Sequence, residues 1–556
     1  MVLLIEDRVQ THGIALGNVT VSESDRPDEW NVIISDDMNY EKMKLRVDGK
    51  EITFDRQKMY MSYDMNVMIP AYVFNDVFKC AFNTYTEDNI VLQKGSSVAS
   101  LHADSDYVSV GEQQVYVPQA YVNKDGIAYI NSLVLENILG YSSNWDSKEN
   151  VLVLVDNKAS ESILPSSYNY RNVGRINPIK NQGKMSTCWA FAAISAVETS
   201  IMPKEDYRLS VDNMVNNNGY AVTMNDGGDY TRSIAYLTSW KGPVLDSDDE
   251  YGDGICNTEA KPVKHVQEVQ LIESKNLEAI KKAVFLYGGV ESSLYTSMSD
   301  TDATSIYYNN ATNSYCYIGT LRPNHDIVIV GWDDNYSKDN FSAGLEGDGA
   351  FICMNSWGSD FGDDGLFYVS YYDSNIGIHN VVYTGIEDTD NYDNIYQSDI
   401  CGWVGQLGYE EDNAYFSNVY EAKGDEMLEA TGFYATGKNT SYEIYVVEDF
   451  IDESSFDNMV FQQSGVFGNA GYYTVNLKNP VQMQAGKKYA VVVKIKTPDS
   501  VHPIAIEYCA GRATRKVILS DGEGYISLTG KSWEHVEESK SCNICLKMYT
   551  SNVGDN

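Results

Sequence analysis

Residues 187–202, TCWAFAAISAVETSIM, constrain the fold of this chain more than any other segment. The apolar residues in this segment recur at the spacing of an amphipathic helix with one buried face. That face would carry Ala190, Ala193, Ile194, Val197 and Ile201. We therefore predict a helix that begins at or near Cys188, with Ser186 or Thr187 available to cap its free N–H groups.

Cys188, at the start of this predicted helix, has two interpretations. A thiol in the first helical turn lies at the positive end of the helix dipole, which favours the nucleophilic thiolate. Most free cysteines, however, are simply small buried side chains. The local sequence leaves both interpretations open, because a nucleophile also needs a base and a group that orients the base.

Two apolar segments, HDIVIVGW and GAFICMN, are predicted to form core strands that hold such groups. The first segment begins with His325, and an imidazole at the start of a strand is fixed yet reachable, as a general base must be. The second ends in Asn355, whose neutral amide could orient an imidazole, and Trp357 could shield that contact from water. A packing histidine and a turn-forming asparagine are the alternatives.

The order Cys188, His325, Asn355 is the order found in papain-like cysteine proteases. QGKMSTCWAF resembles the family's Q-G-x-C-G-S-C-W-A-F, NHDIVIVGWDD resembles H-A-V-x-x-V-G-Y, and NSWGSDFGDDG resembles N-S-W-G-x-x-W-G-x-x-G. NDGGDY and LSVDNMVN are similar to its Asn-Gly-Gly loop and its L-S-E-Q-x-L-V-D segment. The resemblance covers about residues 165–385 and implies an α+β papain-like fold.

The resemblance also implies the roles of individual residues. Cys188 would be the nucleophile, and His325 would be the base that later protonates the leaving amine. Asn355 would orient His325. Gln182 has the family's spacing for the side chain that stabilises the tetrahedral oxyanion together with the backbone N–H of Cys188.

Four further positions match the family's substrate cleft. Gly227 and Gly228 match glycines whose backbone pairs with an extended peptide, so that substrate is recognised as an added strand. Asn324 matches the residue before the histidine, whose carbonyl contacts substrate, and Trp357 matches the indole that covers the histidine–asparagine contact.

Several positions depart from the family pattern. Met185 replaces a cysteine that usually forms a disulfide beside the active site, and Asp226 occurs near its usual partner, so this bridge is expected to be absent. Ser186 replaces a glycine that borders the cleft. Asp326 follows His325 where a small apolar residue is usual, and a buried carboxylate there would raise the imidazolium pKa or require its own partner. Phe361 replaces a second tryptophan.

Residues 1–157 are predicted to form a small N-terminal α/β repeat domain. Two stretches, beginning IPAYVFNDVF and INSLVLENIL, share an amphipathic segment, an aromatic and acidic turn, and a closing strand. This duplicated unit resembles the N-terminal domain of copper amine oxidases, but without a histidine cluster it implies no copper. A polar linker or processing region is predicted near residues 158–168. The N-terminal region is a candidate inhibitory pro-segment or a tether.

The peptidase domain is predicted to span 158–388, and residues 389–556 are predicted to form an all-β sandwich. Short strands separated by Gly, Asn and Asp turns fill this last region. The region resembles the lectin-like domain that follows papain-like domains in some Gram-positive surface proteases. Related domains bind calcium or wall glycans, so structural calcium is an open alternative here, although no ligand set is evident. CNIC, at Cys542 and Cys545, fits strand cysteines better than a zinc site.

Charge and composition exclude some partners. The formal net charge is −38, from 41 basic and 79 acidic residues, and this excess repels phosphate backbones and argues against nucleic acid. No apolar run is long enough to span a membrane. The start, MVLLIED, is not an intact signal peptide, so the chain is either cytosolic or lacks its leader.

The sequence therefore predicts a bacterial cysteine endopeptidase, secreted or associated with the cell wall, that needs no cofactor or metal for catalysis. Its partners would be protein or peptide substrates and cell-wall glycan. The alternative is a catalytically degenerate papain-like surface protein that acts as an adhesin or glycan-binding scaffold.

Overall fold

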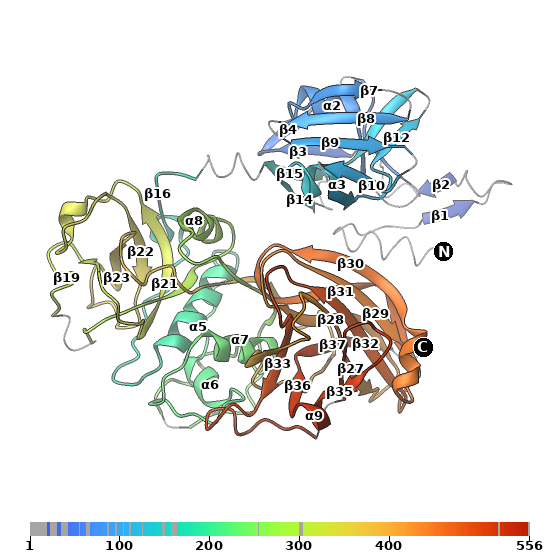
Figure 1. Ribbon diagram of the computed structural model, residues 1–556. Helices are drawn as coiled ribbons and strands as arrows, with labels where there is room; N and C mark the ends of the chain where they lie inside the picture. Colours follow the sequence, from blue (N-terminus) through green and yellow to red (C-terminus); the bar gives the residue numbers. More distant parts are fainter. Residues whose placement is uncertain are drawn as a thin grey trace. The chain divides into compact units, whose positions relative to one another are not determined.

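A computed structural model describes residues 19–22, 31–34 and 43–553, except 55, 63–66, 86–87, 95–96, 104, 111–112, 125, 147–150, 157–163, 254, 300–303 and 521–522. The chain divides into two compact units, Met1–Ile163 and Leu164–Asn556 (Figure 1). No described helix combines the length and apolar character required to cross a membrane.

The described residues of the first unit form short strands and two short helices. Its helices are α2 (Ala71–Asp76) and α3 (Leu133–Asn137). Its strands are β1 (Val19–Ser22), β2 (Asn31–Ile34), β3 (Lys44–Val47), β4 (Lys50–Ile52), β5 (Tyr60–Met61), β6 (Val67–Pro70), β7 (Ala81–Tyr85), β8 (Asn89–Lys94), β9 (Ser97–His102), β10 (Tyr107–Val110), β11 (Gln113–Tyr116), β12 (Tyr121–Lys124), β13 (Ile127–Asn131), β14 (Tyr141–Asp146) and β15 (Val151–Asp156).

The first unit contains the same arrangement twice. In each copy a buried strand leads into a short helix and then a hairpin, as β6–α2–β7–β8 and as β13–α3–β14–β15. The two leading strands pair antiparallel, with Ile69 opposite Ile130, and both side chains lie in one apolar core. The duplicated strand and helix pattern of the sequence is therefore a structural repeat.

The second unit contains the remaining elements. Its helices are α5 (Cys188–Ile201), α6 (Val211–Asn216), α7 (Tyr230–Thr238), α8 (Leu277–Leu286) and α9 (Val536–Ser539). Strands of its first part are β16 (Ser167–Asn169), β17 (His265–Leu271), β18 (Val290–Leu294), β19 (Tyr308–Asn309), β20 (Ser314–Tyr315), β21 (His325–Asp333), β22 (Ala350–Met354), β23 (Leu366–Ser370) and β24 (Asn380–Glu387).

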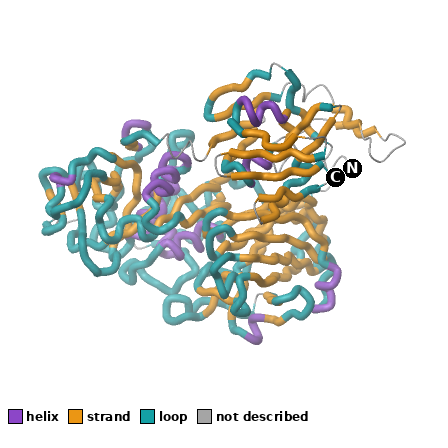
Figure 2. The backbone as a smooth tube through the Cα atoms, turned by 45° about the horizontal axis from the view of Figure 1, so that its top comes forward, coloured by secondary structure: helices purple, strands orange, loops and turns teal. Residues whose placement is uncertain are grey.

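The regular elements of the C-terminal part of this unit are almost all strands (Figure 2). They are β25 (Asn394–Tyr396), β26 (Gly405–Leu407), β27 (Asn413–Glu421), β28 (Glu426–Ala435), β29 (Thr440–Val447), β30 (Val460–Phe467), β31 (Ala470–Met483), β32 (Lys488–Lys496), β33 (Ile504–Tyr508), β34 (Gly524–Ser527), β35 (Glu534–His535), β36 (Cys542–Ile544) and β37 (Leu546–Asn552). A six-stranded sheet, in the order β30-β29-β32-β27-β34-β35, shares an apolar core with β28, β31 and β37.

One sheet continues through both parts of the second unit. Its order is β19-β20-β23-β22-β21-β18-β24-β17-β31-β28-β37-β25, with β16 paired to β21. The two parts meet where β17 pairs antiparallel with β31, from Glu268 opposite Tyr473 to Leu271 opposite Ala470. The strands that carry the candidate catalytic residues thus belong to the same hydrogen-bonded sheet as the C-terminal strands.

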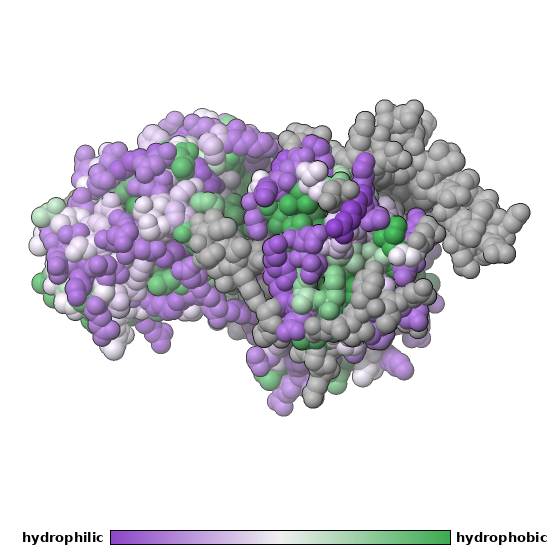
Figure 3. Space-filling view, turned by 90° about the horizontal axis from the view of Figure 1, so that it is seen from above, coloured by the Kyte–Doolittle hydropathy of each residue, from purple (hydrophilic) through white to green (hydrophobic). Residues whose placement is uncertain are grey.

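The core of the second unit surrounds α5. Trp189, Ala193 and Val197 on this helix are almost fully buried, and the same apolar cluster contains Tyr434 and Tyr472 from the C-terminal strands. The face of the molecule in Figure 3 is largely hydrophilic with scattered apolar patches, as expected for so acidic a chain.

These findings confirm the predicted fold class, an α+β papain-like region with a small N-terminal repeat domain and a C-terminal all-β region. The boundaries at 157 and 388 stay predictions. The structure divides the chain after Ile163 and joins the two sides of residue 388 in one unit. Most of the linker predicted at 158–168 lies outside the described residues. Of the CNIC motif, Cys542 is in β36 and Cys545 lies buried just after it.

Candidate active site

A cavity of about 920 Å³ lies at the N-terminal end of α5. Seven of the eight predicted site residues line it, and the eighth, Asn355, is buried behind His325. The lining residues from the prediction are Gln182, Cys188, Gly227, Gly228, Asn324, His325 and Trp357. Residues that are far apart in the sequence therefore converge on one cavity.

Antiparallel pairing brings His325 and Asn355 together. His325 is the first residue of β21, and Asn355 directly follows β22, whose last residue, Met354, pairs with Val328 of β21. The Nε2 atom of His325 lies 2.8 Å from Oδ1 of Asn355. The backbone N–H of Ser356 donates to the same Oδ1 at 2.8 Å and so fixes the orientation of the amide.

This contact determines the tautomer of the imidazole. An amide oxygen only accepts hydrogen bonds, so Nε2 of His325 must carry a proton and donate it to Asn355. In the neutral ring Nδ1 is then the basic nitrogen. The indole of Trp357 stacks on the imidazole, with ring centroids 4.9 Å apart, and holds it in place. His325 is thus prepared to accept a proton at Nδ1.

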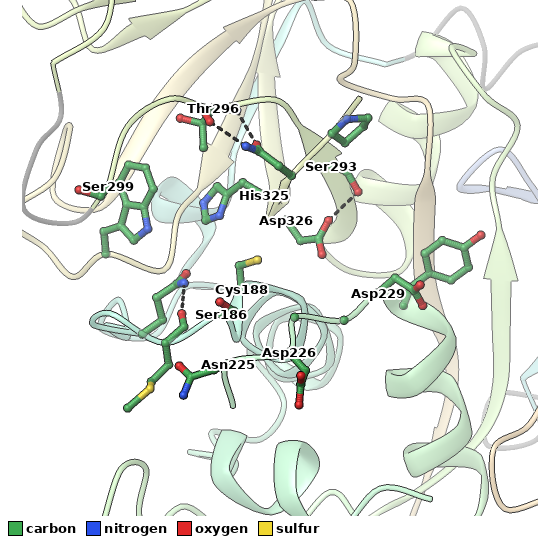
Figure 4. A pocket seen from close by; sticks show the side chains of 18 of the residues that line it. Ser186, Cys188, Asn225, Asp226, Asp229, Ser293, Thr296, Ser299, His325 and Asp326 are labelled. Carbon is green, nitrogen blue, oxygen red and sulfur yellow. Dashed lines mark hydrogen bonds between the residues drawn. The ribbon is translucent and has the colours of Figure 1, made fainter. Parts of the chain in front are cut away.

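Cys188 is the first residue of α5, as predicted, and its sulfur lies between His325 and Asp326 (Figure 4). The predicted side-chain cap was wrong. Thr187 occupies the N-cap position, but its hydroxyl pairs with the hydroxyl of Tyr251 at 2.7 Å instead of capping the helix. The first-turn N–H groups near Cys188 are consequently left without a side-chain cap.

Burial dominates the electrostatics of the pair. It raises the pKa of the Cys188 thiol to about 12, with a further rise from the Asp326 carboxylate and a partial lowering by the backbone N–H of Asp326. Burial lowers the pKa of His325 to about 4, against a smaller upward effect of Asn355. Each group alone therefore resists ionisation.

Gln182 is held rigidly at the edge of the cavity. Its Oε1 accepts a hydrogen bond of 2.6 Å from the Ser356 hydroxyl, and its Nε2 donates to the carbonyl of Met185 at 2.8 Å. The second hydrogen of Nε2 remains for a ligand in the cavity. Sequence reasoning missed the role of Ser356, although this residue lies within the NSW motif beside Asn355.

The other predicted substrate-binding residues are also positioned by local contacts. Gly227 has φ +68°, a left-handed conformation that favours glycine, and its carbonyl accepts a hydrogen bond from Arg232. The side-chain amide of Asn324 exchanges two hydrogen bonds with the backbone of Thr296, at 2.7 and 2.9 Å. These contacts fix the backbone at both positions.

Gly228 lies too close to Trp189 for any side chain. A Cβ atom added to Gly228 would lie 2.5 Å from ring atoms of Trp189. We expect Gly228→Ala to shift this part of the cavity wall, to lower kcat/KM at least about tenfold and to destabilise the fold by about 1–3 kcal/mol. Peptide hydrolysis and thermal unfolding measure the two effects. Gly344→Ala, where an added Cβ meets nothing within 4 Å, is the matched control, and an equal loss there would contradict the explanation.

The departures from the family pattern have defined structural outcomes. All nine cysteines are free, in agreement with the expected absence of a bridge at Met185. The carboxylate of Asp226 accepts hydrogen bonds from the backbone N–H and hydroxyl of Thr223, and Ser186 lines the cavity. Asp326 has the partner that the sequence required, because the Ser293 hydroxyl donates to it at 2.6 Å.

Asp326 should influence the reactivity of Cys188. Its carboxylate raises the pKa of the thiol, so Asp326→Asn is expected to lower that pKa and to increase the thiolate fraction at neutral pH, by about threefold or more. The rate of alkylation by iodoacetamide, measured from pH 4 to pH 10, should then rise at lower pH in the variant. A profile displaced toward higher pH would contradict this sign.

The fold and this arrangement of groups define a papain-like cysteine peptidase domain. Three family models match the chain: papain family cysteine protease at residues 164–386, lectin-like domain at 395–550, and copper amine oxidase N-terminal domain at 46–154. The three resemblances deduced from the sequence are therefore confirmed.

Similar proteins support the same assignment. The chain is 29% identical to cathepsin K of Mus musculus over 218 residues, which cover 37% of this chain and 59% of cathepsin K. It thus spans about three fifths of the length of that relative. Zingipain-2 of Zingiber officinale is 27% identical over 212 residues, which cover 36% of this chain and 86% of zingipain-2.

Solved structures of Cwp84, a surface layer associated protein of Clostridium difficile, match both parts of the second unit. The structure of its cysteine protease and lectin-like domains has 25% identity and a TM-score of 0.61, and the match covers 70% of this chain and 89% of that one. A structure of Cwp84 after propeptide cleavage has 26% identity and a TM-score of 0.63, and covers 70% of this chain and 100% of that one.

Proposed function

We propose that this protein is a cysteine endopeptidase that hydrolyses peptide bonds through a covalent acyl-enzyme. The observation that carries the proposal is the hydrogen bond between His325 and Asn355, which leaves Nδ1 basic in the cavity that Cys188 also lines. The homology to cysteine proteases over residues 164–386 supports it.

In the proposed reaction, His325 removes the thiol proton of Cys188 at Nδ1. The thiolate then attacks the carbonyl carbon of the scissile bond. The N–H of Cys188 and the remaining N–H of Gln182 stabilise the oxyanion. His325 then returns its proton to the leaving amine, and an acyl-enzyme forms on sulfur. A water molecule deprotonated by His325 attacks this thioester, and release of the carboxylic acid restores the thiol.

We further propose that the protein acts outside the cell or at the cell wall. Support comes from Cwp84, which is described as surface layer associated and which shares both the peptidase and the lectin-like parts. In this proposal the lectin-like region binds wall glycan and the substrates are proteins or peptides. Structural calcium in that region stays a prediction, and among the described residues no group of three His, Cys, Asp or Glu side chains is arranged to hold a metal ion.

Removal of the N-terminal unit is part of the proposal. Residues 1–163 form a separate compact unit, and the structure of Cwp84 was obtained after propeptide cleavage. We infer that cleavage between the units releases the active form.

Covalent labelling tests the proposed activity. The reduced protein, both as the full chain and cut after residue 163, is incubated with an epoxysuccinyl peptide inhibitor and its mass is measured. We expect one adduct on Cys188, no adduct in Cys188→Ala and weak labelling in His325→Ala. Without labelling of either form, the endopeptidase proposal fails and the degenerate surface protein becomes the better explanation.

A further inference from the structure

The carboxylate of Asp326 is the feature of the cavity that the proposed chemistry leaves unexplained. Asp326 is the second residue of β21, beside His325, and lies opposite Ser293 of β18. Both residues line the cavity, and the hydroxyl of Ser293 holds one carboxylate oxygen of Asp326 at 2.6 Å. None of the proposed catalytic steps uses this carboxylate, and its charge makes the thiolate of Cys188 harder to form.

The groups around Asp326 add negative charge instead of balancing it. Asp229, at the N-cap of α7, faces the same side of the cavity (Figure 4) and raises the pKa of Asp326. Glu291 is buried behind them, and the hydroxyl of Tyr383 donates to it at 3.0 Å. Cys188 and His325 lie on the other side of Asp326 (Figure 4), and Tyr230 and His379 also line the cavity.

No cation of the described chain compensates this charge. Lys184, Arg322 and His379 also line the cavity, but none of them is among the groups that influence the pKa of Asp326. Burial raises the pKa of Asp326 to about 6, so the carboxylate is still mostly ionised at neutral pH. Asp326 is only partly exposed, at the cavity wall. A carboxylate that is partly withdrawn from water and has no cation is costly, and the cost is relieved when a cation binds beside it.

The position of Asp326 indicates where that cation would come from. A peptide paired with the backbone at Gly227 and Gly228 would run between Asp229 and Cys188, because these glycines directly precede Asp229 in the cavity wall. Residues of an extended peptide advance by about 3.3 Å each, and alternate side chains point to one face. Our proposal places the residues just upstream of the scissile bond beside Gly227 and Gly228, and so within reach of Asp326.

We propose that Asp326 determines specificity by selecting substrates with a lysine or arginine side chain within three residues upstream of the scissile bond. This inference rests on the proposed endopeptidase function and names its substrate class. The carboxylate oxygen of Asp326 that is not bonded to Ser293 accepts hydrogen bonds from the cationic side chain of the substrate. The carboxylate of Asp229, at the cavity rim, attracts the same cation.

Pairs of fluorogenic peptides test the proposal. Each pair carries lysine or Nε-acetyllysine at one of the three upstream positions, so that the two peptides differ in one charge. With the protein cut after residue 163, we expect kcat/KM for the lysine peptide to exceed that of its partner at least about tenfold at one position. Asp326→Asn should bring this ratio close to one, and Asp326→Lys should favour glutamate at the same position.

Asp226→Asn is the matched control. Asp226 also lines the cavity, but its carboxylate is bonded to Thr223, so this variant should keep the lysine preference. The pH dependence of the lysine preference in the wild-type protein is a second test, and it does not depend on the folding of a variant. The wild-type preference should fall toward one as the pH drops through about 6, because the protonated carboxyl of Asp326 has no charge.

The outcomes separate this inference from the proposed function. If Cys188 is labelled and neutral peptides are cleaved, but no position shows a lysine preference, the inference is overturned and the endopeptidase stands. A preference that survives Asp326→Asn, or that does not change with pH, also overturns it. If Cys188 is not labelled and no peptide is cleaved, both proposals fail together.

Discussion

Replacing Cys188 with alanine is expected to lower kcat for peptide hydrolysis by about ten-thousandfold or more. The thiol is the only group in the proposed mechanism that forms a covalent bond to substrate, so its removal leaves the oxyanion donors and the binding cleft without a nucleophile. Single-turnover hydrolysis of a fluorogenic peptide measures the loss.

Cys509→Ala is the control for this substitution. Cys509 is an exposed free thiol that does not line the cavity, so its replacement should leave hydrolysis unchanged. A Cys188→Ala protein that retains more than about one hundredth of wild-type activity would show that another group acts as nucleophile.

Cutting the chain after residue 388 is expected to prevent the peptidase part from folding stably. The cut exposes the edge of β17, which otherwise pairs with β31, and removes buried members of the core around α5. Those members are Tyr434, Tyr472, Ala505 and Cys545. The loss of one large buried aromatic side chain costs about 3–5 kcal/mol, and the loss of two exceeds the margin of many domains.

Soluble yield and thermal unfolding of residues 164–388 measure this effect, with residues 164–556 as the reference. Removal of residues 1–163 alone should leave a folded protein, since these residues form a compact unit of their own. A cooperative unfolding transition for residues 164–388, at a temperature close to that of the longer chain, would refute the dependence on the C-terminal strands.

The convergence of Cys188, His325 and Asn355 was predictable from sequence because each residue lies at the end of a strongly patterned element. The apolar helix after Cys188 and the core strands beside His325 and Asn355 fix the positions of these side chains. Antiparallel pairing of β21 and β22 then brings base and amide together. Seven of the eight residues named in advance therefore line one cavity, and Asn355 lies behind His325.

The cap of α5 and the join between β17 and β31 were beyond the sequence. Threonine is a residue type that often caps helices, but the hydroxyl of Thr187 forms a hydrogen bond with the hydroxyl of Tyr251, which is distant in sequence. The pairing of Glu268 with Tyr473 joins two strand edges that nothing in either segment marks as partners. Long-range contacts of this kind override the local preferences of a segment. The alternation of apolar and polar residues predicts a strand, but it does not predict which other strand will pair with it.

Because all nine cysteines are free, the redox state of Cys188 can change without breaking a disulfide that holds the fold together. A reductant destabilises a protein by cleaving its disulfides, and it has no such bond to cleave here. Oxidation of Cys188 to a sulfenic acid or a mixed disulfide would stop catalysis, and thiols would reverse both changes. In the proposed mechanism, activity therefore depends on the redox state of Cys188, whereas the described fold holds no disulfide that this change would break.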